Sequence, residues 1–230
     1  MAKKYKIADV MRKLRHEPIK TWFDLGLFLD SVRENRAQPP LEFNGNFEQY
    51  KKKLRRGGVA FITFYYAVDG VTFEVKKYSE AFQHIFGRQI PIHFIAGHID
   101  PEAQLPKSAA KHVIAEMAAF DYWGLYKDFF FHKLRRGNKK YNELIGKFWN
   151  ETLTITEKLG HYIEENNIRV LYLINTNSNP GNVSLALALV LLSEYLHLPV
   201  INNNHDFYWE GGNKKIDIKM KRLKDRKSVV

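Results

Sequence analysis

The residues best placed to do chemistry are His205 and Asp206, which follow a short apolar segment late in the chain. An imidazole can donate a hydrogen bond to a polar ligand, and it can transfer a proton when its pKa lies near neutrality. The pair also fits a loop histidine that is held by its own neighbouring aspartate. Both interpretations stay open on the sequence alone, and His205 is the candidate catalytic residue.

Asparagine is dense in the same part of the chain. An amide group both donates and accepts hydrogen bonds, which suits the hydroxyl groups of a sugar. Asparagine is also common in ordinary turns, so a purely structural interpretation stands beside the functional one. The residues concerned are Asn175, Asn177, Asn179, Asn182, Asn202, Asn203 and Asn204.

Other familiar chemistry has weak support in the sequence. The nine histidines show no spacing typical of a zinc site, so we predict no metal site. These 230 residues contain no cysteine, which excludes disulfides and thiolate ligands among them. Neither the GxSxG turn of serine hydrolases nor the GxGxxG turn of nicotinamide-binding proteins occurs.

A predicted β-α-β unit positions the polar residues. Residues 169–174 form an apolar strand, and a turn leads into a helix at 182–197 that is apolar on nearly every side. A second strand starts at residues 199–201 and runs toward His205. A helical crossover makes the two strands parallel and the connection right-handed. Both polar loops then leave the carboxyl ends of neighbouring strands, where open α/β sheets bind ligands.

An earlier β-α-β unit has the same organisation. Residues 59–68 are the strongest strand signal in the chain, and a loop at 69–72 leads into a helix at 73–86 and a strand at 90–96. The backbone N–H groups at the start of that helix favour a phosphate or carboxylate. Residues 107–167 are mostly helical and aromatic in pattern, with a break at residues 135–138.

These patterns predict an α/β fold with a Rossmann-like parallel sheet, flanking helices and a helical N-terminal extension. The predicted boundaries are 1–57 for the extension, 58–210 for the Rossmann-like domain and 211–230 for a basic tail. No apolar segment fits a signal peptide or a membrane span, so we expect a soluble, cytoplasmic protein.

The net charge of +11 is concentrated in residues 1–57 and 214–230, and the middle of the chain is near neutral. Solvated termini are the simpler interpretation, and binding to an anionic surface is the alternative. An amphipathic helix around residues 7–14 packs on its own domain or makes weak contact with a membrane surface. No specific nucleic-acid partner is predicted.

Four motifs together resemble the N-terminal half of a GT-B glycosyltransferase, nearest to the retaining family-4 enzymes that include sucrose and mannosyl transferases. The motifs are VAFITFYYAVDGVTFEVKKYSEAF (59–82), IPIHFIAGH (90–98), VLYLINTNSNPGNVSLALA (170–188) and PVINNNHDFYWE (199–210). The resemblance implies transfer of a sugar from a nucleoside-diphosphate sugar to an acceptor hydroxyl with retention. It implies no cofactor besides the nucleotide sugar, which is the donor substrate.

The resemblance also implies roles for individual residues. The loop of Asp69, Gly70 and Val71 would approach the donor diphosphate, and Glu74 would support that loop. His205 would contact the donor sugar. The residues implied at the acceptor are Asn177, Asn179, Gly181, Asn182 and Asp206.

The chain departs from the family pattern at two points. Asp69-Gly70 stands where the family has two glycines, and the two-glutamate motif of the family's donor site is absent from these 230 residues. GT-B enzymes bind the nucleotide mainly in a second Rossmann-like half, which needs on the order of 150 residues. We therefore expect a fragment, or one half of a two-subunit enzyme, that is inactive alone.

Two other classes of function stay open beside the glycosyltransferase. One is a non-catalytic α/β module that binds a nucleotide, a sugar or a protein partner. The other is a basic protein that binds anionic surfaces through its ends. These classes differ in their dependence on salt, because binding through surface cations weakens steeply as salt rises.

Overall fold

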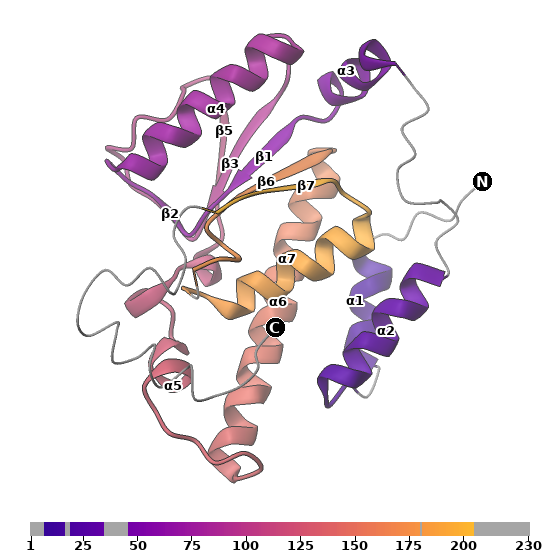
Figure 1. Cartoon of the computed structure of the whole chain (residues 1–230), viewed down its shortest axis with the longest axis vertical. Coiled ribbons are helices and arrows are strands. Elements are labelled where there is room, and N and C mark those ends of the chain that lie inside the picture. Colours follow the sequence, from indigo (N-terminus) through magenta and orange to yellow (C-terminus); the bar gives the residue numbers. More distant parts are fainter. Residues whose placement is uncertain (1–6, 17–18, 35–45, 180, 205–230) are drawn as a thin grey trace.

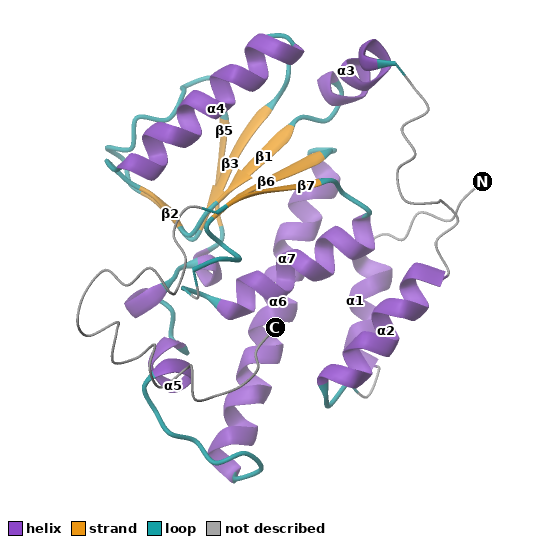
Figure 2. Cartoon of the chain, in the orientation of Figure 1, coloured by secondary structure: helices purple, strands orange, loops and turns teal. Residues whose placement is uncertain are grey.

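The computed structural model describes residues 7–16, 19–34, 46–179 and 181–204. Its centre is a five-stranded parallel sheet with helices on both faces (Figures 1 and 2), which confirms the predicted α/β class. The sheet order is β5-β3-β1-β6-β7. The strands are β1 (Val59–Ile62), β3 (Ile92–Ala96), β5 (Ala110–Val113), β6 (Val170–Ile174) and β7 (Val200–Asn203).

Helices surround the sheet, and two short strands lie beyond it. The α-helices are α1 (Ile7–His16), α2 (Trp22–Glu34), α3 (Phe47–Arg55), α4 (Gly70–Phe86), α5 (Tyr126–Phe130), α6 (Lys139–Glu165) and α7 (Val183–Leu196). Short 3-10 helices are η1 (Ala115–Met117) and η2 (Phe120–Tyr122). The strands β2 (Tyr65–Tyr66) and β4 (His98–Ile99) pair with each other in parallel.

The direction of winding reverses between β1 and β6. The chain proceeds from β1 through β3 to the edge strand β5, and then returns to the other side of β1 as β6 and β7. Val59 of β1 therefore pairs with Ile92 on one side and with Val170 on the other. This is the topological switch point of a doubly wound sheet, where ligands bind at the carboxyl ends of the strands.

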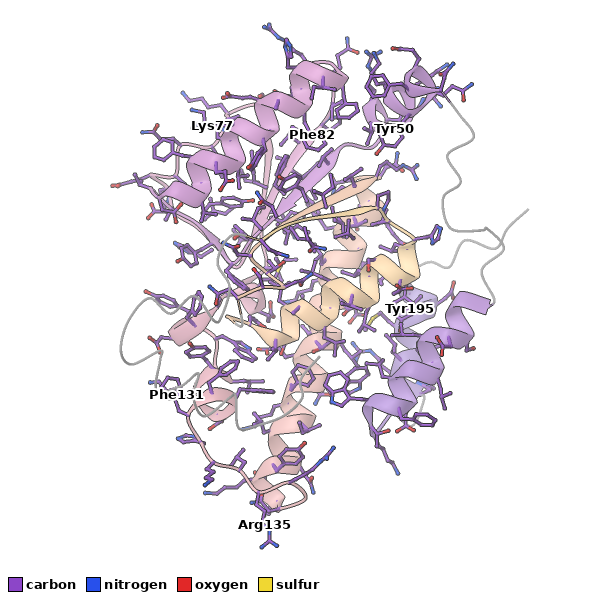
Figure 3. All side chains as sticks on the ribbon, in the orientation of Figure 1. Tyr50, Lys77, Phe82, Phe131, Arg135 and Tyr195 are labelled. Carbon is purple, nitrogen blue, oxygen red and sulfur yellow. The ribbon has the colours of Figure 1, made fainter. Side chains whose placement is uncertain are left out.

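An aromatic layer fixes α4 on one face of the sheet. The Phe61 ring of β1 lies 5.8 Å from that of Phe94 and 4.9 Å from that of Tyr172, on the two neighbouring strands. Phe82, which Figure 3 labels on the sheet side of α4, meets Phe61 edge-on at 5.8 Å. Large aromatic side chains bury much apolar surface in such a layer. The layer holds the start of α4 beside the carboxyl edge of the sheet.

The opposite face is covered by α6 and α7, with α1 packed against both. The four large apolar residues of α1 are buried, and they belong to the same core as Ala60 and Ile62 of β1. Gly160 of α6 permits this close approach, because a Cβ there would lie 2.4 Å from Ile7 Cγ1 and 3.0 Å from Leu192 Cδ2. The apolar face of α1 is therefore inside the protein and is not free to meet a membrane.

The predicted strand at residues 59–68 is wrong in its length, because it is interrupted after Ile62. Gly97 N donates to the Phe64 carbonyl (2.9 Å), and the Phe64 ring packs against Phe120 at 5.8 Å. The chain resumes as β2, where the hydroxyl of Tyr66 donates back to the Phe61 carbonyl (2.9 Å). Burial of aromatic side chains on both sides of the interruption explains why the sequence looks like one continuous strand.

The mostly helical reading of residues 107–167 missed the strand β5. This strand pairs with β3 at the edge of the sheet, and its four residues are largely exposed. The predicted break at residues 135–138 is confirmed, because it lies between α5 and α6. Gly137 there has φ +84°, and the Asn138 side chain caps α6 by accepting from Tyr141 N (2.8 Å).

The apolar helix predicted at residues 182–197 is α7. Asn182 caps its start, and His197 ends it in the left-handed conformation with φ 55°. Most of its apolar residues are buried, although Val190 keeps 43% of its surface exposed. Among the described helices, none combines the length and the apolar character that crossing a membrane requires.

Candidate functional site

The candidate site lies at the carboxyl edge of the sheet, at the switch point between β1 and β6. Figure 1 shows the starts of α4 and α7 at this edge, beside β2. The loops that follow β1 and β6 meet there, so the edge collects residues that are far apart in the sequence. The expectation that the loops after β6 and β7 share one edge is also confirmed, since Asn177 Nδ2 donates to Asn202 Oδ1 at 3.0 Å.

The loop after β1 is held by its own hydrogen bonds. The Asp69 carboxylate accepts from Thr72 N (2.8 Å), so it caps α4, which begins at Gly70 and not at the predicted residue 73. Thr72 Oγ1 in turn accepts from Ala67 N (3.1 Å). Gly70 and Val71 then form the first turn of α4, whose N–H groups have no partner inside the helix. A Cβ at Gly70 would meet no atom within 4 Å, so this turn is open to a ligand.

Glu74 belongs to a group of polar residues whose proximity was not predicted from the sequence. Its Oε1 accepts from the Tyr78 hydroxyl (2.6 Å), and the Tyr78 ring lies 5.5 Å from that of Tyr172 on β6. The hydrogen bond to Glu74, followed by burial, raises the pKa of Tyr78. Burial, with the nearby Tyr78 and Glu74, raises the pKa of Tyr172 to about 12. A hydrogen bond from the Asn203 side chain of β7 acts in the opposite direction and lowers the pKa of both tyrosines.

One signal for this group is present in the sequence. Glu74 and Tyr78 are four residues apart in a helix, which places them on the same face. Tyr172 looked like an ordinary apolar strand residue, and only the packing of α4 on β6 reveals its polar neighbours. The four residues Glu74, Tyr78, Tyr172 and Asn203 are called the tyrosine–glutamate cluster below.

Two buried polar atoms of the loop after β6 have no hydrogen-bond partner within the described residues. These atoms are Thr176 Oγ1 and Ser178 Oγ, and Thr176 is only 1% exposed. An unpaired buried polar group costs about 1–3 kcal/mol. These two hydroxyl groups are therefore suited to pairing with a ligand that both donates and accepts hydrogen bonds.

Two of the predicted acceptor residues have structural roles. Asn182 is 1% exposed, and its Nδ2 donates to the carbonyls of Glu116 (2.9 Å) and Ala118 (2.8 Å) while its Oδ1 accepts from Leu185 N (2.9 Å). At Gly181 a Cβ would lie 2.9 Å from the Ala119 Cβ. Both residues hold the start of α7 against the segment around η1 and η2.

Of the remaining predicted site residues, the structure describes Asn177 and Asn179 but not His205 and Asp206. Asn177 is exposed and Asn179 is partly exposed, so both side chains can reach a ligand at the edge. His205 and Asp206 lie outside the described residues. In the sequence they follow Asn203, the last residue of β7, by two and three positions.

Two hollows lie elsewhere on the surface, and both are open to solvent. One, of about 770 Å³, runs beside β5 and is lined in part by His112, Lys158 and His161. The other, of about 550 Å³, lies near the end of α4 and is lined in part by His84 and Arg88. Neither is lined by a predicted site residue. Within the described residues, no three His, Cys, Asp or Glu side chains are grouped so as to hold a metal ion.

The carboxyl edge of the sheet brings several kinds of polar group together. The loop after β6 supplies amides and hydroxyls, and the first turn of α4 supplies N–H groups, with the carboxylate of Glu74 beside them. Such a set suits a polar ligand with many hydroxyl groups. Comparison of the chain with family models, with curated proteins and with solved structures finds no match.

Proposed function

We propose that this chain is the acceptor-side half of a retaining GT-B glycosyltransferase, which transfers a sugar from a nucleoside-diphosphate sugar to an acceptor hydroxyl. The observation that carries the proposal is the pair of unpaired buried hydroxyl oxygens in the loop after β6, Thr176 Oγ1 and Ser178 Oγ. It supports the resemblance of the four motifs, because these motifs supply the loops that end at the same edge.

The chemistry of the loop after β6 favours the hydroxyl groups of a sugar over a charged group. The loop after β6 offers amides and hydroxyls, which pair with hydroxyl groups in either direction. Buried groups of this kind discriminate strongly against a ligand that leaves them unpaired. Glu74 and Tyr78 provide one carboxylate and one hydroxyl on the α4 side, which are suited to a sugar hydroxyl at the margin of the site.

In this proposal the protein acts mainly by positioning. The N–H groups of Gly70 and Val71 would stabilise negative charge on the donor phosphates, and Glu74 would support that turn. His205 would hold the donor sugar, and Asn177, Asn179 and Asp206 would hold the acceptor. Catalysis would then come from orientation of the two substrates and from stabilisation of the departing diphosphate.

The proposal requires a second Rossmann-like half. The sheet described here accounts for one half of a GT-B enzyme, and the nucleotide would be held between the two halves. The second half is supplied either by a longer chain or by a partner subunit. We expect these 230 residues to bind sugars weakly and to turn over little or no donor by themselves.

A single hydroxyl tests the proposed site. Thr176→Val keeps the shape of the side chain and removes the buried Oγ1. We expect it to weaken binding of hydroxyl-rich ligands roughly fivefold to tenfold, because one neutral hydrogen bond contributes about 1–1.5 kcal/mol. Binding is measured by ligand-observed NMR with glucose, fructose, mannose, UDP-glucose and GDP-mannose as probes.

The chain offers a matched control in Thr152→Val. Thr152 is also a buried threonine with an unpaired Oγ1 among the described residues, but it lies on α6 and faces the core. It should leave sugar binding unchanged. Equal losses in the two variants, or no binding of any probe by the unaltered chain, would overturn the site. Binding of a protein partner without any sugar binding would favour the non-catalytic module.

A further inference from the structure

The end of the molecule opposite α4 exposes large apolar side chains. On α2, Trp22 is 62% exposed, Phe23 is 72% exposed and Leu27 is 55% exposed. Phe23 and Leu27 are four residues apart and therefore share one face of the helix. The other side of α2 is anchored, because Leu25 is buried and Phe28 meets Tyr195 of α7 edge-on at 5.9 Å. The helix is thus held in place with its apolar outer face turned to solvent.

The apolar surface continues from α2 onto α6. The Trp22 ring lies 6.4 Å from the ring of Phe148 in the first half of α6. Ile145 lies three residues before Phe148, on the same side of the helix, and is 36% exposed. The exposed apolar residues of α2 and of this part of α6 are called the apolar end below: Trp22, Phe23, Leu27 and Ile145.

A run of cations leads into the first turn of α6, and its last member, Lys140, stands five residues before Ile145 on that helix. The connection from α5 into the first turn of α6 is exposed, and it contains no acidic residue between Lys133 and Asn142. Figure 3 shows Arg135 at the lower tip, pointing away from the rest of the molecule. The cations are Lys133, Arg135, Arg136, Lys139 and Lys140, called the basic loop below.

The acidic residue nearest to Trp22 and Phe23 is already engaged. The Asp24 carboxylate accepts from the backbone N–H groups of Lys20 (3.0 Å) and Thr21 (2.8 Å) at the start of α2. These hydrogen bonds lower the pKa of Asp24, so it stays ionised at neutral pH while the helix N-terminus offsets part of its charge. On α6, Glu143 Oε1 lies 4.0 Å from Lys139 Nζ, and the basic loop keeps a net positive charge beside this ion pair through Lys133, Arg135, Arg136 and Lys140.

We infer that the apolar end and the basic loop together bind the surface of a membrane that contains anionic lipid. Tryptophan and other large apolar side chains enter the boundary between headgroups and acyl chains, while adjacent lysine and arginine attract anionic headgroups. A nucleic acid would use the cations but not Phe23 and Leu27, so the combination favours lipid. This inference is independent of the proposed glycosyltransferase activity.

Vesicle co-sedimentation tests the inference with the whole chain. We expect binding to vesicles of phosphatidylglycerol mixed with phosphatidylcholine, much weaker binding to phosphatidylcholine alone, and weakening as salt rises. The double variant Phe23→Ser/Leu27→Ser should lower the affinity at least tenfold. Both residues are exposed, so circular dichroism should show an unchanged fold. Ile85→Ser, at a residue of α4 that is 55% exposed, should have no effect.

Charge reversal distinguishes the effect of the basic loop on vesicle binding from the effect of the net charge of the chain. Arg135→Glu/Arg136→Glu should remove most vesicle binding. Lys77→Glu/Arg88→Glu makes the same change in net charge on α4 and just after its end, and it should leave most of the binding. Equal losses in the two pairs would overturn the inference in favour of general attraction. Unchanged binding after Phe23→Ser/Leu27→Ser, or loss of binding only when residues 214–230 are removed, would also overturn it. Poly-uridine RNA that binds as tightly as the vesicles would point to a polyanion site instead, if the binding is lost in Arg135→Glu/Arg136→Glu and kept in Phe23→Ser/Leu27→Ser.

Discussion

His93 is a buried histidine whose environment is built by three elements. It lies on β3 and is 5% exposed, and its Nδ1 shares a hydrogen bond of 3.0 Å with the hydroxyl of Tyr162 on α6. The Tyr162 ring is stacked on His112 of β5 at 4.0 Å, and the charge of Glu165 acts on His112. Within the described residues, His93 Nε2 has no partner. A proton added to His93 would therefore place an unpaired charge inside the protein.

This environment predicts a loss of stability in acid. Burial lowers the pKa of His93 from its ordinary value of 6.5, so the unfolded chain takes up the proton before the folded chain does. The contribution of neutral His93 to the free energy of unfolding is complete above pH 6.5, and it is lost as the pH falls below that value. In His93→Gln, the free energy of unfolding should fall less steeply between pH 7.5 and pH 5.5, as measured by urea denaturation.

Two controls separate His93 from its neighbours. His84 is exposed on α4, and His84→Gln should leave the pH dependence unchanged. His112→Gln should reduce the slope in the same direction, because burial also lowers the pKa of His112, with Glu165 opposing that effect. If His93→Gln and the unaltered chain lose stability in parallel as the pH falls, protonation of His93 does not limit the fold.

Individual site residues were predictable only where chain order brings them together. Asn177 and Asn202 are 25 residues apart, yet a parallel β-α-β unit has to place both at one edge, and they are hydrogen-bonded. Glu74 and Tyr172 are nearly one hundred residues apart and meet only because α4 packs across β1 and β6. The second kind of contact depends on tertiary packing, which no local pattern in the sequence records.

At the scale of elements, the start of α7 is fixed by one side chain. Asn182 caps this helix and also donates to the carbonyls of Glu116 and Ala118. We expect Asn182→Ala to lower the free energy of unfolding by about 2–4 kcal/mol. The lost cap contributes about 1 kcal/mol and the unpaired buried carbonyls contribute the rest. Urea denaturation monitored by circular dichroism measures the change.

Asn138→Ala is the matched control for this prediction. Asn138 also caps a helix through its Oδ1, which accepts from Tyr141 N, but it lies exposed at the start of α6. Its removal should cost only about 1 kcal/mol, the ordinary value for a cap. Equal costs at the two positions would mean that the bonds from Asn182 to Glu116 and Ala118 contribute nothing measurable.

The elements differ in how strongly the sequence specifies them. The β1, β3 and β6 segments are apolar and β-branched because both of their faces are covered by helices, so their pattern is strong. The edge strand β5 reads AKHV, and its exposed residues leave no apolar run to detect. Strands that are buried on both faces can therefore be found from the sequence, whereas an exposed edge strand is defined by its partner.

At the scale of the whole molecule, α1 is part of the core of the sheet domain. The sequence division placed residues 1–57 in a separate extension, and the pattern of α1 fitted either self-packing or membrane contact. In the structure, Arg15 of α1 is paired with Glu157 of α6 (2.6 Å), and Ile7 N donates to Glu164 Oε1 (2.8 Å). The segment closes over α6 and α7, and it is more than 100 residues away from them in the sequence.

This packing predicts that α1 unfolds together with the sheet. Leu14 is 1% exposed in the shared core, so Leu14→Asp would bury an unpaired carboxylate or displace the helix. We expect a loss of about 3–5 kcal/mol, a large part of the ~5–15 kcal/mol that stabilises a typical domain. Lys13→Asp changes the neighbouring exposed residue and should cost less than about 1 kcal/mol.

The cooperativity of unfolding decides whether α1 belongs to the same folding unit as the sheet. Tryptophan fluorescence follows several regions at once, while hydrogen exchange resolves α1 and β6 separately. In Leu14→Asp, protection should fall in β6 and α7 as well as in α1, because the three share one core. Loss of protection confined to α1, with β6 unchanged, would show that the sheet holds its fold without this helix. Residues 7–16 would then be a separable extension, as the sequence alone suggested.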